Sequence, residues 1–230
     1  MPVVRRLACE VERVVDHGDH VYTVTLAPAS PAPAFRPGQF LHLALDPFEP
    51  GGFWPESRVF SIASSPIDRD RLAITYAVKG AFTGRMEREL APGREVWVKL
   101  PYGEFTVDPS RDAVLFAGGT GVTAFTAFLG SLPACGARRV ALFYGARTPD
   151  LFVYGDFVAS RAAEVAGLDV HLVCEATDGR LSVAGAWPVI ESLDCPPAYL
   201  SGPPAMLAAL TAQLRACGVP ETDVRTDAWE

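Results

Sequence analysis

Apolar and polar residues alternate in several short runs of the first half of the chain. A period of two is typical of half-buried β-strands, so we expect strands at residues 21–26, 40–45, 72–78 and 95–100. Turn-rich stretches separate these runs, and residues 84–90 carry the one helical pattern of this half. Many short strands with a single helix predict a small antiparallel β-barrel of the Greek-key type.

The second half alternates strand-like with helix-like segments. We expect strands at 113–117, 140–144, 169–173, 198–200 and 224–226, and helices at 122–132, 154–165 and 203–217. This alternation predicts an α/β domain with a doubly wound parallel sheet. A polar turn near residues 108–112 separates the halves, so we expect two domains, residues 1–108 and residues 112–230.

The composition is that of a globular protein, because 49% of the 230 residues are hydrophobic and only 20% are charged. The formal net charge is −7 and the basic residues are dispersed, which argues against a nucleic-acid partner. No apolar stretch approaches the length of a membrane span, and the first residues lack the apolar region of a signal peptide. We therefore expect a cytoplasmic protein without a membrane span.

The cysteines do not form a metal-binding motif. The five of them are scattered and odd in number, and none has the spacing of a zinc site or a ferredoxin-type iron–sulfur cluster. The four histidines likewise show no metal spacing. We expect reduced thiols and no metal site.

A glycine turn, Gly118–Thr123, directly follows the apolar run Ala113–Ala117. A strand that runs into glycines and then a helix suits a dinucleotide pyrophosphate. The glycines let the backbone approach the phosphates, and the helix start offers N–H groups and a positive dipole end. The pattern Gly119-x-Gly121-x-x-Ala124 fits the looser form of the nucleotide fingerprint. A glycine turn without a ligand is common here, so this motif alone leaves both interpretations open.

Three further motifs accompany the glycine turn: Arg58-Val59-Phe60-Ser61, Gly80-x-x-Thr83 and Ser201-Gly202-Pro203-Pro204. In this order and at these separations, the motifs resemble the ferredoxin–NADP reductase superfamily of two-domain flavoenzymes. The resemblance covers essentially the whole chain, residues 3–230. It implies that the N-terminal barrel binds a flavin and that the C-terminal domain binds NAD(P).

The resemblance assigns three roles to the first motif. Arg58 would bind a flavin phosphate with two parallel hydrogen bonds, because a guanidinium matches the geometry of a phosphate. Phe60, where the family usually has tyrosine, would lie against the isoalloxazine ring. The Ser61 hydroxyl would hydrogen-bond near the reactive N5 atom. An exposed strand arginine and a core phenylalanine are the alternative without a ligand.

The second motif would supply another phosphate clamp. Val78 and Lys79 would lie beside the phosphate or adenosine portion of the flavin. Gly80 and Thr83 precede the helix expected from Gly84, and Thr83 suits an N-cap whose helix start meets the pyrophosphate. Capping alone would also explain Thr83. We expect FAD, because a pyrophosphate suits an arginine paired with a helix start; FMN remains the alternative.

The third motif and the glycine turn would bind the nicotinamide nucleotide. The pyrophosphate would be held by the turn residues Gly118, Gly119, Thr120, Gly121 and Thr123. Gly202 and Pro203 lie where a later strand ends, at the edge where open α/β sheets bind ligands. Ser201 stands where the family usually has a cysteine, beside the nicotinamide carbon that gives up its hydride. A glycine–proline turn that starts a helix is the alternative.

The end of the chain resembles a family ending in which a carboxylate precedes an aromatic residue by two. Asp227 would be a carboxylate near the flavin N5 atom, with Glu230 as a possible substitute, and Trp229 would cover the flavin face. A frayed terminus is the alternative. Arg147 suits the 2′-phosphate of NADP, although the family carries a similar arginine in NADH users, so both nucleotides remain open.

The resemblance predicts an FAD-dependent NAD(P)H reductase in which Ser61, Ser201 and Asp227 assist hydride transfer. Because no cluster is encoded, the electron acceptor would be a separate ferredoxin, haem protein or oxygenase component. One alternative is a flavin reductase that releases its flavin as product. Another is an electron-relay or regulatory subunit that oxidises little NAD(P)H itself.

Overall fold

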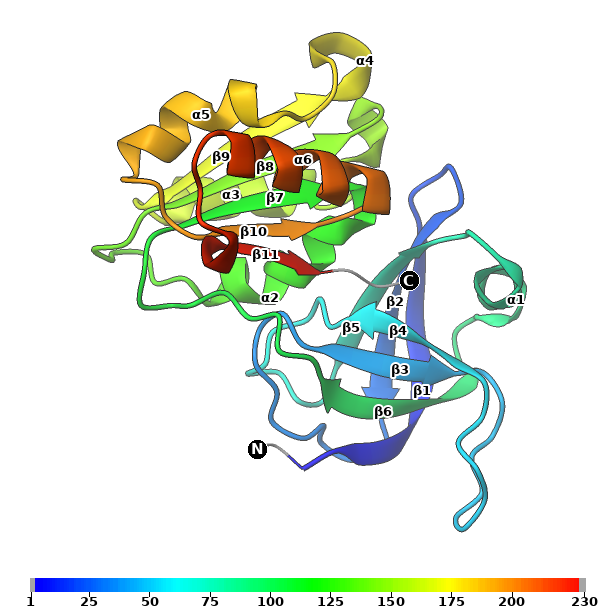
Figure 1. Cartoon of the computed structure of the whole chain (residues 1–230). Coiled ribbons are helices and arrows are strands. Elements are labelled where there is room, and N and C mark those ends of the chain that lie inside the picture. Colours follow the sequence, from blue (N-terminus) through cyan, green and yellow to red (C-terminus); the bar gives the residue numbers. More distant parts are fainter. Residues whose placement is uncertain (1–2, 228–230) are drawn as a thin grey trace. The chain divides into compact units, whose positions relative to one another are not determined.

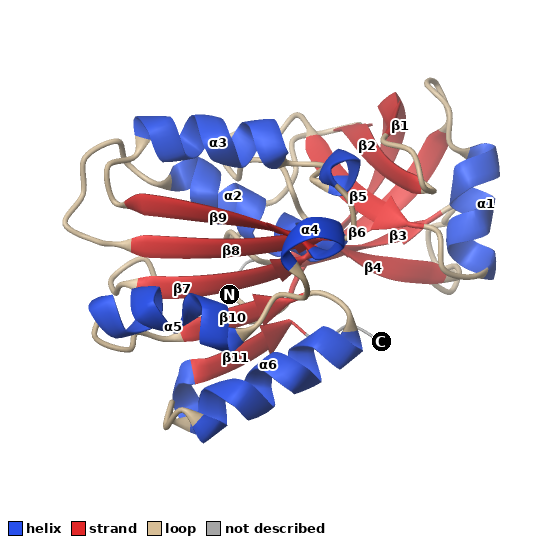
Figure 2. Cartoon of the chain, turned by 90° about the horizontal axis from the view of Figure 1, so that it is seen from above, coloured by secondary structure: helices blue, strands red, loops and turns tan. Residues whose placement is uncertain are grey.

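The computed structural model describes residues 3–227, and its chain divides into two compact units, Met1–Thr106 and Val107–Glu230. The first is built of β-strands with one helix, and the second alternates strands with helices (Figures 1 and 2). Within residues 3–227, no helix is both long enough and apolar enough to cross a membrane.

The first unit is a six-stranded antiparallel sheet. Its elements are β1 (Arg5–Asp16), β2 (Val21–Pro28), β3 (Phe40–Ala44), β4 (Ser57–Ser61), β5 (Leu72–Ala77), α1 (Ala81–Glu89) and β6 (Glu95–Tyr102). The strands run in the order β4-β3-β6-β1-β2-β5, so β6 returns to lie beside β3 as in a Greek key. The Ala63 N–H donates to the Ala73 oxygen at 2.8 Å, which joins the chain after β4 to β5. The sheet thus curls into a near-closed barrel, and the predicted barrel is confirmed.

Alternate residues of each strand point into the barrel. Leu41 and Leu43 of β3 are fully buried there, as are Val96 and Val98 of β6. Helix α1 covers the same core with its buried residues Phe82 and Met86. Apolar contacts therefore hold the helix against the barrel and set its distance from the core.

Strand β1 was not predicted from the sequence. Leu7, Cys9 and Val11 alternate into the core, but the pairing with β2 shifts register between Val11 and Arg13. A bulge inserts one residue and moves the apolar positions by one, so the period of two is broken at Glu12. The many charged residues of this strand also make the alternation of apolar and polar positions hard to recognise.

A polar link joins α1 to the hairpin between β1 and β2. Nδ1 of His20 and Oε1 of Glu87 form a 2.7 Å hydrogen bond, and the Tyr22 hydroxyl donates to the same oxygen at 2.9 Å. Glu87 raises the pKa of His20, with Asp19 and Asp16 adding in the same direction. His20 and Tyr22 lower the pKa of Glu87.

This link predicts a pH dependence of stability. Because the pKa of His20 is raised by folding, its contribution is complete below the unfolded pKa of about 6.5 and is lost as pH rises through the folded value. We expect the wild type to lose more unfolding free energy than His20→Gln between about pH 6 and pH 8.5. Urea unfolding of both proteins at each pH measures this, and equal losses would contradict it.

The second unit is a five-stranded parallel sheet. Its strands are β7 (Ala113–Gly118), β8 (Val140–Ala146), β9 (Leu168–Cys174), β10 (Ala198–Ser201) and β11 (Val224–Asp227). Its helices are α2 (Thr123–Ser131), α3 (Gly155–Glu164), α4 (Glu175–Asp178), α5 (Val183–Ser192) and α6 (Pro204–Ala216), with short 3₁₀ turns at η1 (Gly119–Val122), η2 (Pro149–Leu151) and η3 (Glu221–Asp223). The strand order is β11-β10-β7-β8-β9.

This order is that of a doubly wound sheet, so the predicted architecture is confirmed. Helices α2 and α3 lie on one side of the sheet and α5 and α6 on the other (Figure 2). Val114 and Phe116 of β7 lie in one core with Ile190 of α5 and Leu210 of α6. Helix α5 was not predicted, because Pro188 inside it is typical of a helix end.

The chain reverses its direction of winding between β7 and β10. Open sheets of this kind bind ligands at the carboxyl ends of the strands on either side of that reversal. The turns after β7 and β10 are the glycine turn and the segment from Ser201 onward. The topology therefore brings together two motifs that the sequence separates by about 80 residues.

Candidate functional site

Arg58 and Phe60 lie on the face of β4 that looks into the barrel. They are paired with Leu43 and Leu41 of β3, which are fully buried, and residues paired across antiparallel strands share a face. The Arg58 guanidinium carbon is 5.0 Å from the ring centre of Phe82, in the first turn of α1. The structure thus places this arginine beside the start of α1.

The Arg58 guanidinium remains accessible to a ligand. Its side chain is 51% exposed and pairs at 2.9 Å with Glu56, which is 56% exposed. It also donates to the Ser57 oxygen at 2.9 Å. An ion pair at this exposure contributes little to stability, so a phosphate can replace Glu56 at small cost.

Phe60 and Ser61 have different surroundings. Phe60 is partly buried against the barrel core, with its ring centre 6.1 Å from that of Tyr76. Ser61 is paired with Phe40 and partly buried. The Tyr76 hydroxyl is buried without a hydrogen-bond partner among residues 3–227, and burial raises its pKa. Sequence reasoning missed Tyr76, because alternation alone does not distinguish it from any other core residue of β5.

The start of α1 corrects the expected role of Thr83. The helix begins at Ala81 with Gly80 as its N-cap, so Thr83 is its third residue and the expected start at Gly84 is wrong. The Thr83 hydroxyl accepts hydrogen bonds from the N–H groups of Lys79 at 2.9 Å and Gly80 at 3.1 Å. Because Gly80 has no side chain to cap the helix, Thr83 reaches back and stabilises the turn instead.

The residues around this turn leave space for a ligand. A Cβ atom at Gly80 would meet nothing within 4 Å. Lys79 is exposed, and the partly buried Val78 donates its N–H to the His20 oxygen at 2.9 Å. The structure therefore joins Arg58, Gly80 and the first turn of α1 in one region.

Three glycines of the second unit allow the turns after β7 and β10 to touch. A Cβ atom at Gly121 would lie 2.4 Å from the Ser201 oxygen, and one at Gly202 would lie 3.1 Å from the Gly118 Cα atom. A Cβ atom at Gly118 would lie 2.5 Å from the sulfur of Met206 and 3.0 Å from Pro203. Backbone atoms therefore exclude a side chain at Gly121, whereas at Gly118 the nearest obstacle is the side chain of Met206.

Gly119 differs from its neighbours. Its φ is +53°, a conformation that favours glycine, and a Cβ atom there would meet nothing within 4 Å. The sequence predicted that the glycines as a group let a phosphate approach. The open side of the turn is at Gly119, whereas Gly118 and Gly121 are filled by protein atoms.

Ser201 and Asp227 form a buried pair. They are paired across β10 and β11, and the Ser201 hydroxyl donates to Oδ2 of Asp227 at 3.1 Å. Each residue is only 4% exposed. The sequence motifs treat them separately, because they are 26 positions apart and only the parallel pairing of the last two strands brings them together.

We expect Ser201→Ala to lower the unfolding free energy by about 1–3 kcal/mol, because it removes a donor to a buried carboxylate. Ser192→Ala is the matched control, since the hydroxyl of this exposed serine donates to the Val189 oxygen of the same helix, at 2.8 Å. Its effect should stay within about 0.5 kcal/mol. Equal effects of the two substitutions in urea unfolding would contradict the importance of the pair.

The remaining predicted residues of this unit lie at the turns after β7 and β10 or just after β8. The hydroxyl of the buried Thr123 donates to the Thr120 oxygen at 2.8 Å. Pro203 is the N-cap of α6. Arg147 is exposed just after β8, and its backbone oxygen accepts from the Ala176 N–H at 3.2 Å. Trp229, like Glu230, lies outside the described residues.

Comparison with known proteins gives relatives over nearly the whole chain, although no family model matches. The chain is 28% identical over 228 residues to the ferredoxin reductase component of 3-ketosteroid-9-alpha-monooxygenase from Mycolicibacterium smegmatis. It is also 28% identical to the reductase component of propane 2-monooxygenase from Rhodococcus jostii. These matches cover 96% and 97% of the chain but 63% and 64% of the relatives. The chain thus spans slightly less than two thirds of their length.

The solved structures show the same fold. The FAD/NAD-binding domain of nitric oxide dioxygenase from Vibrio cholerae superposes with a TM-score of 0.82 at 21% identity, covering 97% of this chain and 98% of that one. The chain is thus similar to these reductase components along nearly its whole length, and its two units have the fold of the ferredoxin–NADP reductase superfamily.

Proposed function

We propose that the chain binds FAD in its first unit and NAD(P)H in its second, and that it works as an NAD(P)H-dependent reductase for a separate electron acceptor. One observation carries this proposal most directly. At the reversal point of the parallel sheet, the turns after β7 and β10 are in van der Waals contact and leave the outer side of Gly119 open. A dinucleotide needs such a turn, with accessible backbone at a helix start.

The first unit has the donors that the FAD diphosphate requires. The half-exposed Arg58 guanidinium lies beside the first turn of α1, so the arginine and the helix start would both bind the same anion. Val78 and Lys79 would lie along the same portion of the ligand. Phe60 would contact the isoalloxazine ring. The Ser61 hydroxyl would hydrogen-bond near N5. FMN would use the same donors with one phosphate fewer.

In the second unit, Gly119 and Thr120 would bind the pyrophosphate, and Arg147 the ribose end of NADH or NADPH. Ser201 would contact the nicotinamide. A serine hydroxyl has one proton, and here that proton points to Asp227, so the oxygen offers only lone pairs to a ligand. Asp227 would then set the direction of this hydrogen bond. Gly118, Gly121 and Gly202 would keep the two turns together.

The bound flavin would supply the redox chemistry, accepting a hydride from NAD(P)H and releasing electrons one at a time. The relatives named above are reductase components of monooxygenases. We therefore propose an oxygenase component as the acceptor, reached directly or through a ferredoxin or haem protein. The similarity of the chain to these reductase components supports this class of partner.

Anaerobic titration of the FAD-loaded protein with NADH and NADPH in turn tests this function. We expect the flavin absorbance to bleach with one nucleotide at lower concentration than with the other. Gel filtration before the titration distinguishes a flavin reductase, which would lose its flavin. A flavin that is retained but not bleached by either nucleotide would contradict the proposal and favour an electron-relay subunit.

A further inference from the structure

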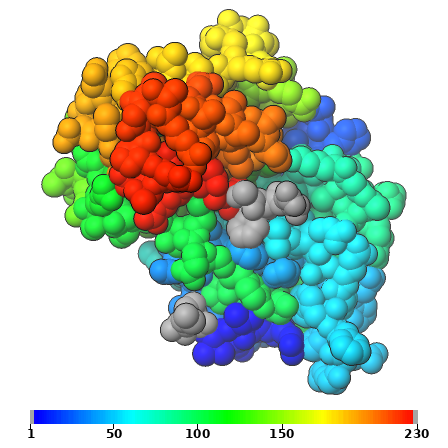
Figure 3. All heavy atoms as spheres, viewed as in Figure 1, coloured from blue at the N-terminus to red at the C-terminus, as the bar shows by residue number. Residues whose placement is uncertain are grey.

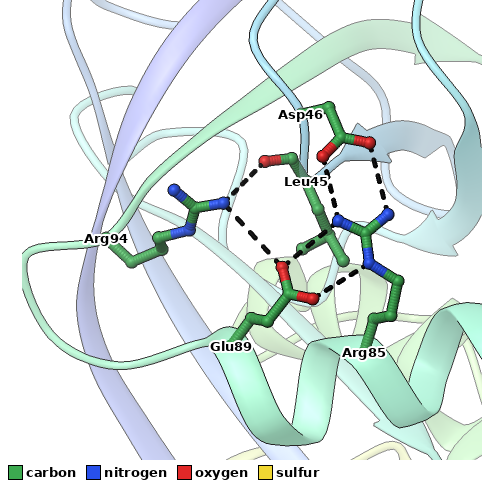
Figure 4. A network of polar contacts seen from close by, with 5 residues as sticks. All are labelled: Leu45, Asp46, Arg85, Glu89 and Arg94. Atoms are coloured by element: carbon green, nitrogen blue, oxygen red, sulfur yellow. Dashed lines mark hydrogen bonds and ion pairs between the residues drawn. The ribbon is translucent and has the colours of Figure 1, made fainter.

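A network of charged side chains holds the outer flank of α1. Arg85 donates to both oxygens of Asp46, at 2.9 and 3.2 Å, and to both oxygens of Glu89, at 2.9 and 3.2 Å (Figure 4). Arg94 donates to the Leu45 oxygen at 3.1 Å and lies 3.9 Å from Glu89. The guanidinium of Arg85 thus binds two carboxylates, one of them on another segment of the barrel.

The network joins segments that are far apart in the sequence. Asp46 stands at the base of the loop between β3 and β4, residues 45–56, which projects from the unit with Phe53 fully exposed (Figures 1 and 3). Arg94 directly precedes β6. Arg85 is 31% exposed, and its hydrogen bonds lower the pKa of both Asp46 and Glu89. The carboxylates therefore stay ionised at neutral pH.

This network constrains α1 in a way that its apolar contacts cannot. Phe82 and Met86 hold the helix against the core, but apolar burial has no preferred direction. A bidentate arginine–carboxylate pair fixes direction and distance together. Arg85 lies two residues after Thr83, so the pair acts within the first turns of the nine-residue helix.

We propose that the Asp46–Arg85 pair is a positioning pair that sets the start of α1 for the flavin diphosphate. The inference rests on the proposed function, because it concerns the same flavin site. The pair does not touch the ligand. It holds the helix start in a fixed position relative to Arg58. Its loss therefore weakens the binding of ligands that carry phosphate and leaves the flavin ring contacts unchanged.

The same unit contains a matched control. Arg71 of the first unit donates to both oxygens of Glu12, at 2.8 and 3.0 Å. This pair has the same bidentate form and a similar exposure, 57% and 40%, but it links β1 to the segment before β5, and neither residue belongs to α1. Its removal reports the general effect of losing a surface ion pair.

The experiment measures the dissociation constants of FAD and riboflavin for the wild type, Asp46→Asn and Glu12→Gln by fluorescence titration. Riboflavin has the same ring and no phosphate. We expect Asp46→Asn to weaken FAD binding by about three- to tenfold, riboflavin binding to change by less than about twofold, and Glu12→Gln to alter neither. Asp46→Glu should restore most of the FAD affinity, because it keeps the charge.

Two results would overturn the inference, and they are distinguishable. If wild type prefers FAD to riboflavin and Asp46→Asn keeps the same preference as Glu12→Gln, the pair is only structural and the proposed function stands. If the wild type binds no flavin, the proposed function fails and the inference with it. Should Asp46→Asn not fold, Arg85→Lys replaces it, since lysine keeps the charge and loses the bidentate geometry.

Discussion

Arg58→Ala is expected to weaken FAD binding by about 10- to 100-fold, because it removes charge-assisted hydrogen bonds to a phosphate. The physical reason is local. The guanidinium lies beside the first turn of α1, and its carboxylate partner Glu56 is itself half exposed, so in the proposed complex the arginine is the positive partner of the diphosphate. Titration of the apoprotein with FAD, followed by fluorescence, measures the effect.

A second arginine of the same unit provides the control for this substitution. Arg36 pairs with Glu104 at 3.0 Å, and the two side chains are 55% and 88% exposed. Arg36→Ala therefore removes an equally exposed cation that has no proposed contact with the ligand. FAD affinity that falls equally in the two variants would show that Arg58 acts through net charge alone. Arg58→Lys should bind FAD with intermediate affinity.

Gly121→Ala is expected to have the largest effect in the second unit. The new Cβ atom would lie 2.4 Å from the Ser201 oxygen and 2.7 Å from the Gly202 nitrogen. These are backbone atoms of the opposite turn, so they cannot rotate away and one turn must move. We expect the unfolding free energy to fall by about 1–3 kcal/mol, and the NAD(P)H concentration that half-bleaches the flavin to rise by at least about tenfold.

Gly130 of α2 is the matched control. A Cβ atom there would lie 3.8 Å from a ring atom of Phe157, which is ordinary van der Waals contact. Gly130→Ala should therefore stabilise the protein by about 0.5–1 kcal/mol, because alanine favours a helix. Urea unfolding of both variants measures the change in stability, and titration with NAD(P)H measures the change in nucleotide affinity. A Gly121→Ala protein as stable as the wild type would show that the two turns are not packed as described.

Much of the fold could be predicted from the residue pattern because periodicity reports burial directly. The strand at Leu72–Ala77 shows its period of two, and the helix at Pro204–Ala216 shows its longer period. Prediction failed where a local feature broke the period. The bulge at Glu12 hid β1, and Pro188 hid α5, although tertiary packing stabilises both elements.

The candidate residues were predictable as separate motifs, but their contacts were not. Thr83 reads as a helix cap in sequence, and only the structure shows that Gly80 caps the helix while Thr83 stabilises the turn from within. The pairing of Arg85 with Asp46 could not be predicted, since they are 39 positions apart and neither belongs to a motif. Their pairing depends on how the β3–β4 loop meets α1.

The sequence by itself determined that the chain has a strand-rich half and an α/β half, because the period of the apolar residues differs between them. It also determined which short motifs carry the candidate chemistry. Only the tertiary structure decided that Ser201 bonds to Asp227 and that Gly121 faces Ser201, since both contacts arise from the parallel pairing order of β7, β10 and β11. Strand order depends on packing between distant segments, and no local pattern encodes it.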